Sequence, residues 1–143
     1  MKTVKDILKT KKDQLISIAP EATVFEAIKL MADKGVGALL VMESGKLLGI
    51  MSERDYARKV IIQGKSSKET SVSAIMTGKV MVVTPRNTIE ECMALMTEKY
   101  VRHLPVVEDG IVLGVVSIGD VVKAIISEQH FTINNLINYI TGS

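Results

Sequence analysis

Aromatic residues are scarce in this sequence: tryptophan is absent, and aromatic residues make up only 3% of the 143 positions. Because 47% of the residues are hydrophobic, the chain has enough apolar material for a folded core and too much to be disordered. That core has to be built from Val, Ile, Leu, Met and Ala. The length is that of a single domain of common size.

Cysteine and net charge are equally limited. The single cysteine, Cys92, excludes an internal disulfide bond and is typical of a reducing compartment. A formal net charge of +2 does not favour nucleic-acid binding, and we interpret the basic cluster of Lys9, Lys11 and Lys12 as the solvated end of a short helix. Residues 2–6 carry charges where a secretory signal needs an apolar run, and no stretch approaches the roughly 18 apolar residues of a membrane-spanning helix. We therefore expect a cytoplasmic protein with no membrane or nucleic-acid partner.

The sequence does contain one short pattern twice, at residues 49–55 and 114–120. Each copy reads Gly, two apolar residues, Ser, two variable residues, Asp, and each follows an apolar run and precedes a helical pattern. Both copies therefore place a hydroxyl group and a carboxylate at a strand-to-helix turn. These groups belong to Ser52, Asp55, Ser117 and Asp120.

The residues around the first copy predict a defined series of elements. We expect a short strand at 15–18, a helix opened by a Thr23/Glu26 capping box and closed by Gly35, and two buried strands at 38–42 and 47–51 joined by a hairpin turn. A helix should start at Ser52, with these residues facing inward: Tyr56, Ala57, Val60 and Ile61. The polar segment 63–71 is predicted to be a linker.

The same series recurs around the second copy, with a strand at 80–83 and a helix opened by Thr88 and Glu91. The repetition predicts a mixed α/β (α+β) fold made of two β-α-β-β-α units: 1–66 for the first repeat with an N-terminal helix, and 67–129 for the second. Because a unit of about 60 residues has only a marginal core, we expect the two to pack through their sheets around a pseudo-two-fold axis, with a groove on either side of the contact.

A helical tail is predicted at 130–143, with Thr132 as its cap and Gly142 near its end. It has no counterpart in the first repeat, and we expect it to pack on the body or on a second subunit. It lacks the Lys and Arg face of helices that lie on membranes.

Paired β-α-β-β-α units that each end in Gly-apolar-apolar-Ser-x-x-Asp resemble tandem CBS domains, the arrangement called a Bateman module. The Pro-x-x-Thr helix start in both copies and the phrase at 101–106 add to the resemblance, which covers roughly residues 4–127. The resemblance implies regulatory sensing, in signal transduction, of an adenosine-containing ligand such as AMP, ADP, ATP or NAD(H), without catalysis. It also implies a homodimer and a regulated protein partner in trans.

By the same resemblance, Asp55 and Asp120 accept hydrogen bonds from the ribose hydroxyls, and Ser52 and Ser117 contact the ribose or first phosphate. The adenine would lie in apolar slots formed by two sets of residues. In the first repeat these are Ile18, Ala19, Gly37, Ala38 and Leu39; in the second they are Val83, Thr84, His103, Leu104 and Pro105.

Phosphate groups require positive charge, for which the sequence offers Arg54 and Arg58 in the first repeat and Arg102 and His103 in the second. Gly119 stands in place of Arg54, so we expect unequal sites, with Arg102 and His103 the better phosphate contacts.

Other interpretations stay open at this point. Ser-x-x-Asp is close to a capping box, so the four residues can serve the helix start alone. An S-adenosylmethionine sensor and a ligand-free dimerisation module are alternatives to a nucleotide sensor. An enzyme is disfavoured because the sequence shows no nucleophile–base pair and no metal-ligand spacing, and Cys92 falls on the apolar face of its helix.

Overall fold

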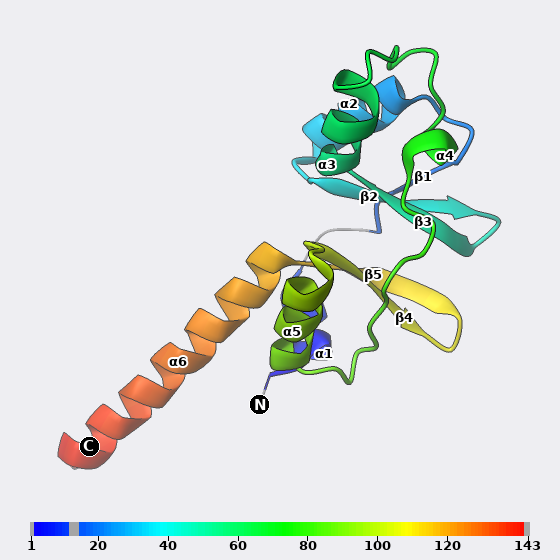
Figure 1. The fold of residues 1–143 in the computed structure, drawn as a ribbon. Coiled ribbons are helices and arrows are strands. Elements are labelled where there is room, and N and C mark those ends of the chain that lie inside the picture. Colours follow the sequence, from blue (N-terminus) through cyan, green and yellow to red (C-terminus); the bar gives the residue numbers. More distant parts are fainter. Residues whose placement is uncertain (1, 12–14, 142–143) are drawn as a thin grey trace. The chain divides into compact units, whose positions relative to one another are not determined.

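The computed structural model describes residues 2–11 and 15–141, which divide into two compact units (Figure 1). We call them the first-repeat unit, drawn from Asp13–Met81 and Asp109–Val112, and the second-repeat unit, drawn from Met1–Lys12, Val82–Glu108 and Leu113–Ser143. Both units combine helices with a small sheet, so the predicted mixed class is confirmed.

The first-repeat unit contains a three-stranded sheet in the order β1-β2-β3. Strand β1 runs parallel to β2, and β2 pairs with β3 in an antiparallel hairpin. The turn residues Ser44 and Gly45 have φ values of 52° and 78°, a left-handed pair that matches the twist of a two-residue hairpin. The elements are β1 (Ser17–Ile18), α2 (Val24–Lys34), β2 (Ala38–Glu43), β3 (Lys46–Ser52), α3 (Glu53–Tyr56), the π-helix η1 (Ala57–Ile61) and α4 (Val72–Ile75).

Helix α2 begins and ends where its sequence predicts. The Thr23 hydroxyl accepts a hydrogen bond from the Glu26 amide at 3.1 Å, and Gly35 closes the helix in the left-handed conformation at φ 66°. Its apolar face buries Val24, Ala27 and Met31 against the sheet.

The second-repeat unit contains a two-stranded sheet covered by helices (Figure 1). Its elements are α1 (Val4–Thr10), α5 (Ile89–Lys99), β4 (His103–Glu108), β5 (Ile111–Ser117) and α6 (Ile118–Thr141). The predicted capping box of Thr88 and Glu91 opens α5, with both of its reciprocal hydrogen bonds present.

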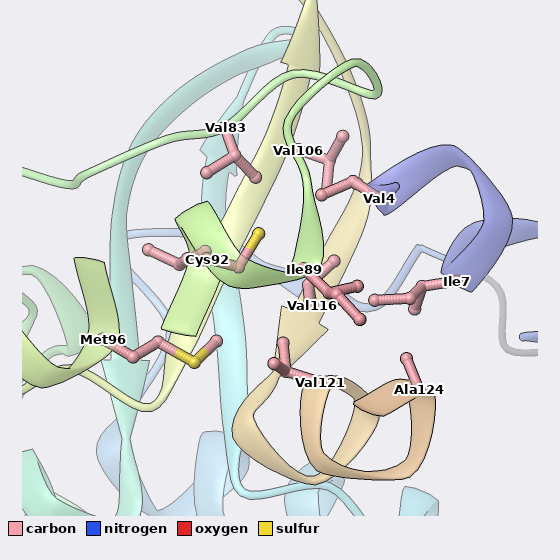
Figure 2. Packing of buried hydrophobic residues seen from close by; sticks show 11 residues of the cluster. Val4, Ile7, Val83, Ile89, Cys92, Met96, Val106, Val116, Val121 and Ala124 are labelled. Carbon is pink, nitrogen blue, oxygen red and sulfur yellow. The ribbon is translucent and has the colours of Figure 1, made fainter. Parts of the chain in front are cut away.

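Figure 2 shows how the helices and strands of the second-repeat unit share one core. Cys92 lies in it with no exposed surface, and burial raises the pKa of its thiol to about 11. The thiol is therefore protonated at neutral pH, as suits an inert core residue. The labelled neighbours are Val4 and Ile7 from α1, Ile89 and Met96 from α5, Val83, Val106 and Val116 from the sheet region, and Val121 and Ala124 from α6.

Packing divides the chain differently from the repeat boundary placed after residue 66. Helix α1 contributes Val4 and Ile7 to the core of the second-repeat unit. Helix α4, which lies at the start of the predicted second repeat, buries Val72 and Ile75 in the core of the first-repeat unit. Each repeat thus receives a short helix that the sequence places beside the other.

The strand expected at 80–83 does not form. Only Val83 pairs, in an isolated parallel bridge with Val106: its amide donates to the Pro105 carbonyl at 2.9 Å, and its carbonyl accepts from the Val107 amide at 2.8 Å. The side chains of Met81 and Val82 are exposed, so they do not pack this segment against the sheet.

The helix after Ser52 was expected to turn Ala57 and Ile61 inward, and this is wrong. The Ile62 amide donates to the Ala57 carbonyl at 3.1 Å, which closes a π-helical turn of wider radius. The wider turn leaves Ala57 and Ile61 exposed and keeps Val60 buried.

The C-terminal helix is longer than expected. Helix α6 runs without a break over 24 residues, so Thr132 does not cap a separate tail: its hydroxyl donates to the Glu128 carbonyl inside the helix. Residues 129–141 are all exposed, so the rest of the second-repeat unit does not bury them. Packing on a second subunit stays a prediction. Lys12 and Gly142, named in the sequence analysis, lie outside the described residues.

Candidate functional site

The two strand-to-helix turns have the same hydrogen-bond geometry. The Ser52 amide donates to Asp55 Oδ2 at 3.0 Å, and the Ser117 amide donates to Asp120 Oδ2 at 2.9 Å. In return each aspartate amide donates to the preceding serine Oγ at 3.2 Å. Both pairs therefore cap the start of the following helix, as one of the sequence-based interpretations held, and capping occupies Oδ2 of each carboxylate.

A second contact joins each turn to the residue before the first strand of the hairpin in its unit, β2 or β4. The Glu53 amide donates to the Gly37 carbonyl at 3.0 Å, and at the corresponding place the Ile118 amide donates to the Arg102 carbonyl at 2.9 Å. These contacts bring Gly37 beside Ser52, and Arg102 beside Ser117, as the predicted sites require.

In the first-repeat turn, both carboxylate oxygens of Asp55 already have hydrogen-bond donors within the protein. Asp55 Oδ1 lies 3.1 Å from the Lys59 ammonium group, and the Thr77 hydroxyl donates to it at 3.4 Å. Lys59 also donates to the Ile75 carbonyl at 2.9 Å. Each oxygen of Asp55 therefore has two donors, the Ser52 amide and hydroxyl at Oδ2 and Lys59 and Thr77 at Oδ1, so a ligand hydroxyl has to displace one of them.

The second-repeat turn keeps one oxygen available. The Lys11 ammonium group donates to Asp120 Oδ2 at 2.9 Å and to the Val115 carbonyl at 2.8 Å. Within residues 2–11 and 15–141, no group donates to Asp120 Oδ1. Burial by itself would raise the pKa of Asp120, but the Ser117 amide and Lys11 outweigh it, so the pKa is lowered and the carboxylate is charged at neutral pH.

Basic side chains gather beside this turn. His103 is half-buried, and burial lowers its pKa; the charges of Lys11 and Arg102 lower the pKa further, against the opposing charge of Asp120. His103 is thus largely neutral near pH 7, while Lys11 and Arg102 carry the positive charge. The group of Lys11, Arg102, His103 and Asp120 combines a carboxylate with cations, as a sugar phosphate requires.

Lys11 was not among the predicted site residues. The sequence places it at the end of a short helix among other lysines, and its partner Asp120 is 109 positions away. A lysine cluster gives no sign of such a contact, so only the packing of α1 against the start of α6 reveals it.

The residues expected around the adenine have few unused groups. Leu39, Val83 and Leu104 are buried, so they offer almost no surface to a ligand. The Val83 backbone is taken by its bridge, and the Thr84 amide donates to Asn87 Oδ1 at 2.8 Å.

The remaining predicted residues are placed as follows. Pro105 is buried; Ile18, Ala19, Gly37 and Ala38 are partly buried; Arg54, Arg58 and Arg102 are exposed. The sequence pattern correctly located the two turns, but it did not predict that Asp120 keeps an available carboxylate oxygen while Asp55 does not.

Other kinds of site have little support in the described part of the chain. It holds no group of three or more His, Cys, Asp or Glu side chains that could bind a metal ion. No helix among these residues has the length and hydrophobicity needed to cross a bilayer.

Comparison with known proteins identifies the repeats. The CBS-domain family model matches residues 4–62 and again residues 72–127. The mitochondrial CBS domain-containing protein CBSX3 of Arabidopsis thaliana is 42% identical over 149 residues, which cover 98% of this chain and 72% of the relative. The CBS domain-containing protein YhcV of Bacillus subtilis is 34% identical over 120 residues, which cover 84% of this chain and 83% of that protein.

Solved structures agree with these matches. A proposed signal-transduction protein with CBS domains from Burkholderia ambifaria is 52% identical and superimposes with a TM-score of 0.86, over 89% of this chain and 96% of the other. The CBS-domain protein ATU1752 from Agrobacterium tumefaciens is 38% identical with a TM-score of 0.81, over 85% and 98% of the two chains.

Proposed function

Because this chain belongs to the CBS-domain family, with one family match in each repeat, we propose that it is a regulatory module that binds an adenosine nucleotide at its Ser-x-x-Asp turns. The proposed ligands are AMP, ADP, ATP or NAD(H), and the proposed role is sensing without catalysis. A homodimer acting on a separate protein partner in the cytosol belongs to the same proposal.

The observation that carries the proposal is the unoccupied oxygen of Asp120. A carboxylate that stays charged and has one free oxygen can accept hydrogen bonds from the two neighbouring ribose hydroxyls. Capping uses only Oδ2, so helix stabilisation and ribose binding are compatible at this residue.

The charges beside Asp120 support a phosphorylated ligand. Lys11 donates two of its hydrogen bonds within the protein, to Asp120 and Val115, and an ammonium group has three. The third hydrogen bond of Lys11 and the exposed guanidinium of Arg102 can meet a phosphate group. We expect the second-repeat site to bind more tightly than the first, where Asp55 is already saturated.

Lys11 also suggests how binding would be transmitted. It joins the end of α1 to the turn that begins α6. A phosphate that draws Lys11 away from Asp120 would loosen this connection, and a partner protein can respond to the change.

Calorimetry with AMP, ADP, ATP, NADH and S-adenosylmethionine tests the proposal. We expect saturable binding of at least one nucleotide and its loss in the double variant Asp55→Ala/Asp120→Ala. Preference for S-adenosylmethionine would replace the nucleotide with that ligand. No binding and no thermal shift with any compound would favour a ligand-free dimerisation module, and product formation during long incubation with ATP would indicate an enzyme.

A further inference from the structure

The C-terminal half of α6 carries an apolar face that no element of the second-repeat unit covers. In Figure 1 this half of the helix extends away from α1, α5 and the β4–β5 hairpin of its own unit. At 1.5 Å per residue, the 24 residues of α6 form a rod about 36 Å long. Its first turns bury Val121 and Ala124 in the unit core, whereas residues 129–141 are all exposed.

The exposed apolar residues follow a heptad pattern. Ile126, Ile133 and Ile140 are seven residues apart and take the a position, and Val122, Gln129 and Leu136 then take the d position. Gln129 is the one polar residue in this register. The five apolar members are 41% to 80% exposed, which is uncommon for large aliphatic side chains arranged in one stripe. We call these six residues the α6 stripe.

The remaining heptad positions fit a helix that pairs along the α6 stripe. The outward b, c and f positions beyond Glu128 hold Asn134, Asn135, Asn138 and Thr141, with Phe131 the only large apolar residue among them. Ile137 and Tyr139 flank the stripe at e and g and widen its apolar surface. The polar and apolar sides of the helix are therefore separated as in a two-helix coiled coil.

From this pattern we propose that the α6 stripe pairs with the same stripe of a second copy of this chain, as a parallel, in-register two-helix coiled coil. All three a positions are isoleucine and the d position Leu136 is leucine, and isoleucine at a with leucine at d favours two parallel strands. A single polar residue in the core, here Gln129, can fix the register of such a pair. A self-complementary surface also closes with two-fold symmetry and leaves no stripe uncovered.

The absence of charged residues in this part of α6 also favours a second copy of this chain as the partner. Residues 129–141 contain no Asp, Glu, Lys or Arg, so two copies bring no like charges together along this stretch. A membrane surface is a poorer fit, because interfacial helices carry Lys and Arg on their polar side. Four of the six stripe residues lie beyond residue 127, where the family match ends, so the part of the proposed contact around Ile133 and Leu136 is distant in sequence from the Ser-x-x-Asp turn.

Cysteine cross-linking in the full chain tests the proposal. At the a position, Ile133→Cys places two thiols across the pairing axis, within the Cα separation that a disulfide allows. At the f position, Asn138→Cys is the matched control, since it faces outward on the far side of each helix. The native Cys92 has no exposed surface, so it can stay in place.

We expect mild oxidation to convert most of the Ile133→Cys protein, and little of the Asn138→Cys protein, to a covalent dimer. Equal yields at the two positions, or no dimer at either, would overturn the proposal. Either result would mean that the α6 stripe contacts the body or a different partner, or is exposed to solvent.

Sedimentation supplies an independent readout. The a/d double variant Ile133→Lys/Leu136→Lys should weaken self-association at least about tenfold, because it removes packing from the centre of the paired stripe. The f-position pair Phe131→Lys/Asn138→Lys adds the same charge and should leave association unchanged. An equal loss in both pairs would contradict the register, and an unchanged a/d variant would contradict the pairing itself. Nucleotide binding should be intact in both variants, so it is tested separately.

Discussion

The difference between the two turns leads to a quantitative prediction. Asp120→Asn keeps an oxygen for the Ser117 amide but removes the charge that ribose hydroxyls would meet at Oδ1. Hydrogen bonds to a charged group contribute about 1.5–3 kcal/mol, so nucleotide affinity at the second-repeat site should fall roughly 10- to 150-fold. Asp55→Asn should cost less, because Lys59 and Thr77 already occupy the corresponding oxygen.

Calorimetry on the two single variants measures this difference, and Asp109→Asn serves as the control. Asp109 is exposed in the β4–β5 turn, so its replacement changes the net charge equally without touching either site. Thermal unfolding would reveal any damage to the cap, whose loss costs about 0.5–2 kcal/mol. Equal losses from Asp120→Asn and Asp55→Asn, or wild-type affinity in Asp120→Asn, would refute the assignment of the free oxygen.

Three further predictions concern stability and reactivity. Gly49→Ala should destabilise the fold by about 1–3 kcal/mol in denaturant unfolding, because the new Cβ would lie 2.5 Å from the Thr77 carbonyl oxygen; an unchanged midpoint would contradict this contact. The folded-state pKa of His103 is lowered, so its contribution to stability is present above its unfolded value near 6.5 and is lost as pH falls through the folded value. His103→Gln should flatten the fall in stability below pH 6.5, and an identical pH profile would count against burial of this ring. Cys92 should resist alkylation in the native protein at pH 8 and react once unfolded, whereas rapid native labelling would show that the core opens.

Local signals predicted the elements whose chemistry is local. Thr23 and Thr88 cap helices as expected, and Gly35 ends its helix, because a cap depends on residues three or four positions apart. The β2–β3 hairpin followed from its Ser44-Gly45 turn between apolar runs, for the same reason.

The predictions that proved wrong concern residues whose placement depends on packing that the local sequence does not encode. All four residues at 80–83 are apolar, three valines and one methionine, yet only Val83 pairs with a strand, and the side chains of Met81 and Val82 are exposed. The π-helical turn at Ala57–Ile61 rotates side chains that a regular helix would turn inward. Helical spacing alone does not reveal an inserted residue.

The candidate site, too, could be predicted from the sequence only in part. Ser52, Asp55, Ser117 and Asp120 were located by their repeated pattern, and the structure gives both turns one geometry. The availability of Asp120 Oδ1 and the approach of Lys11 depend on how α1 packs against α6, and no short motif records this packing.

The most direct test of ribose recognition compares AMP with its 2′,3′-dideoxy analogue by calorimetry. The two ligands share the adenine and the phosphate and differ only in the hydroxyl pair that Asp120 would accept. We predict that wild-type protein binds AMP at least about tenfold more tightly than the analogue, and that Asp120→Asn removes most of this preference. Equal affinity of the wild-type protein for both ligands would contradict the account.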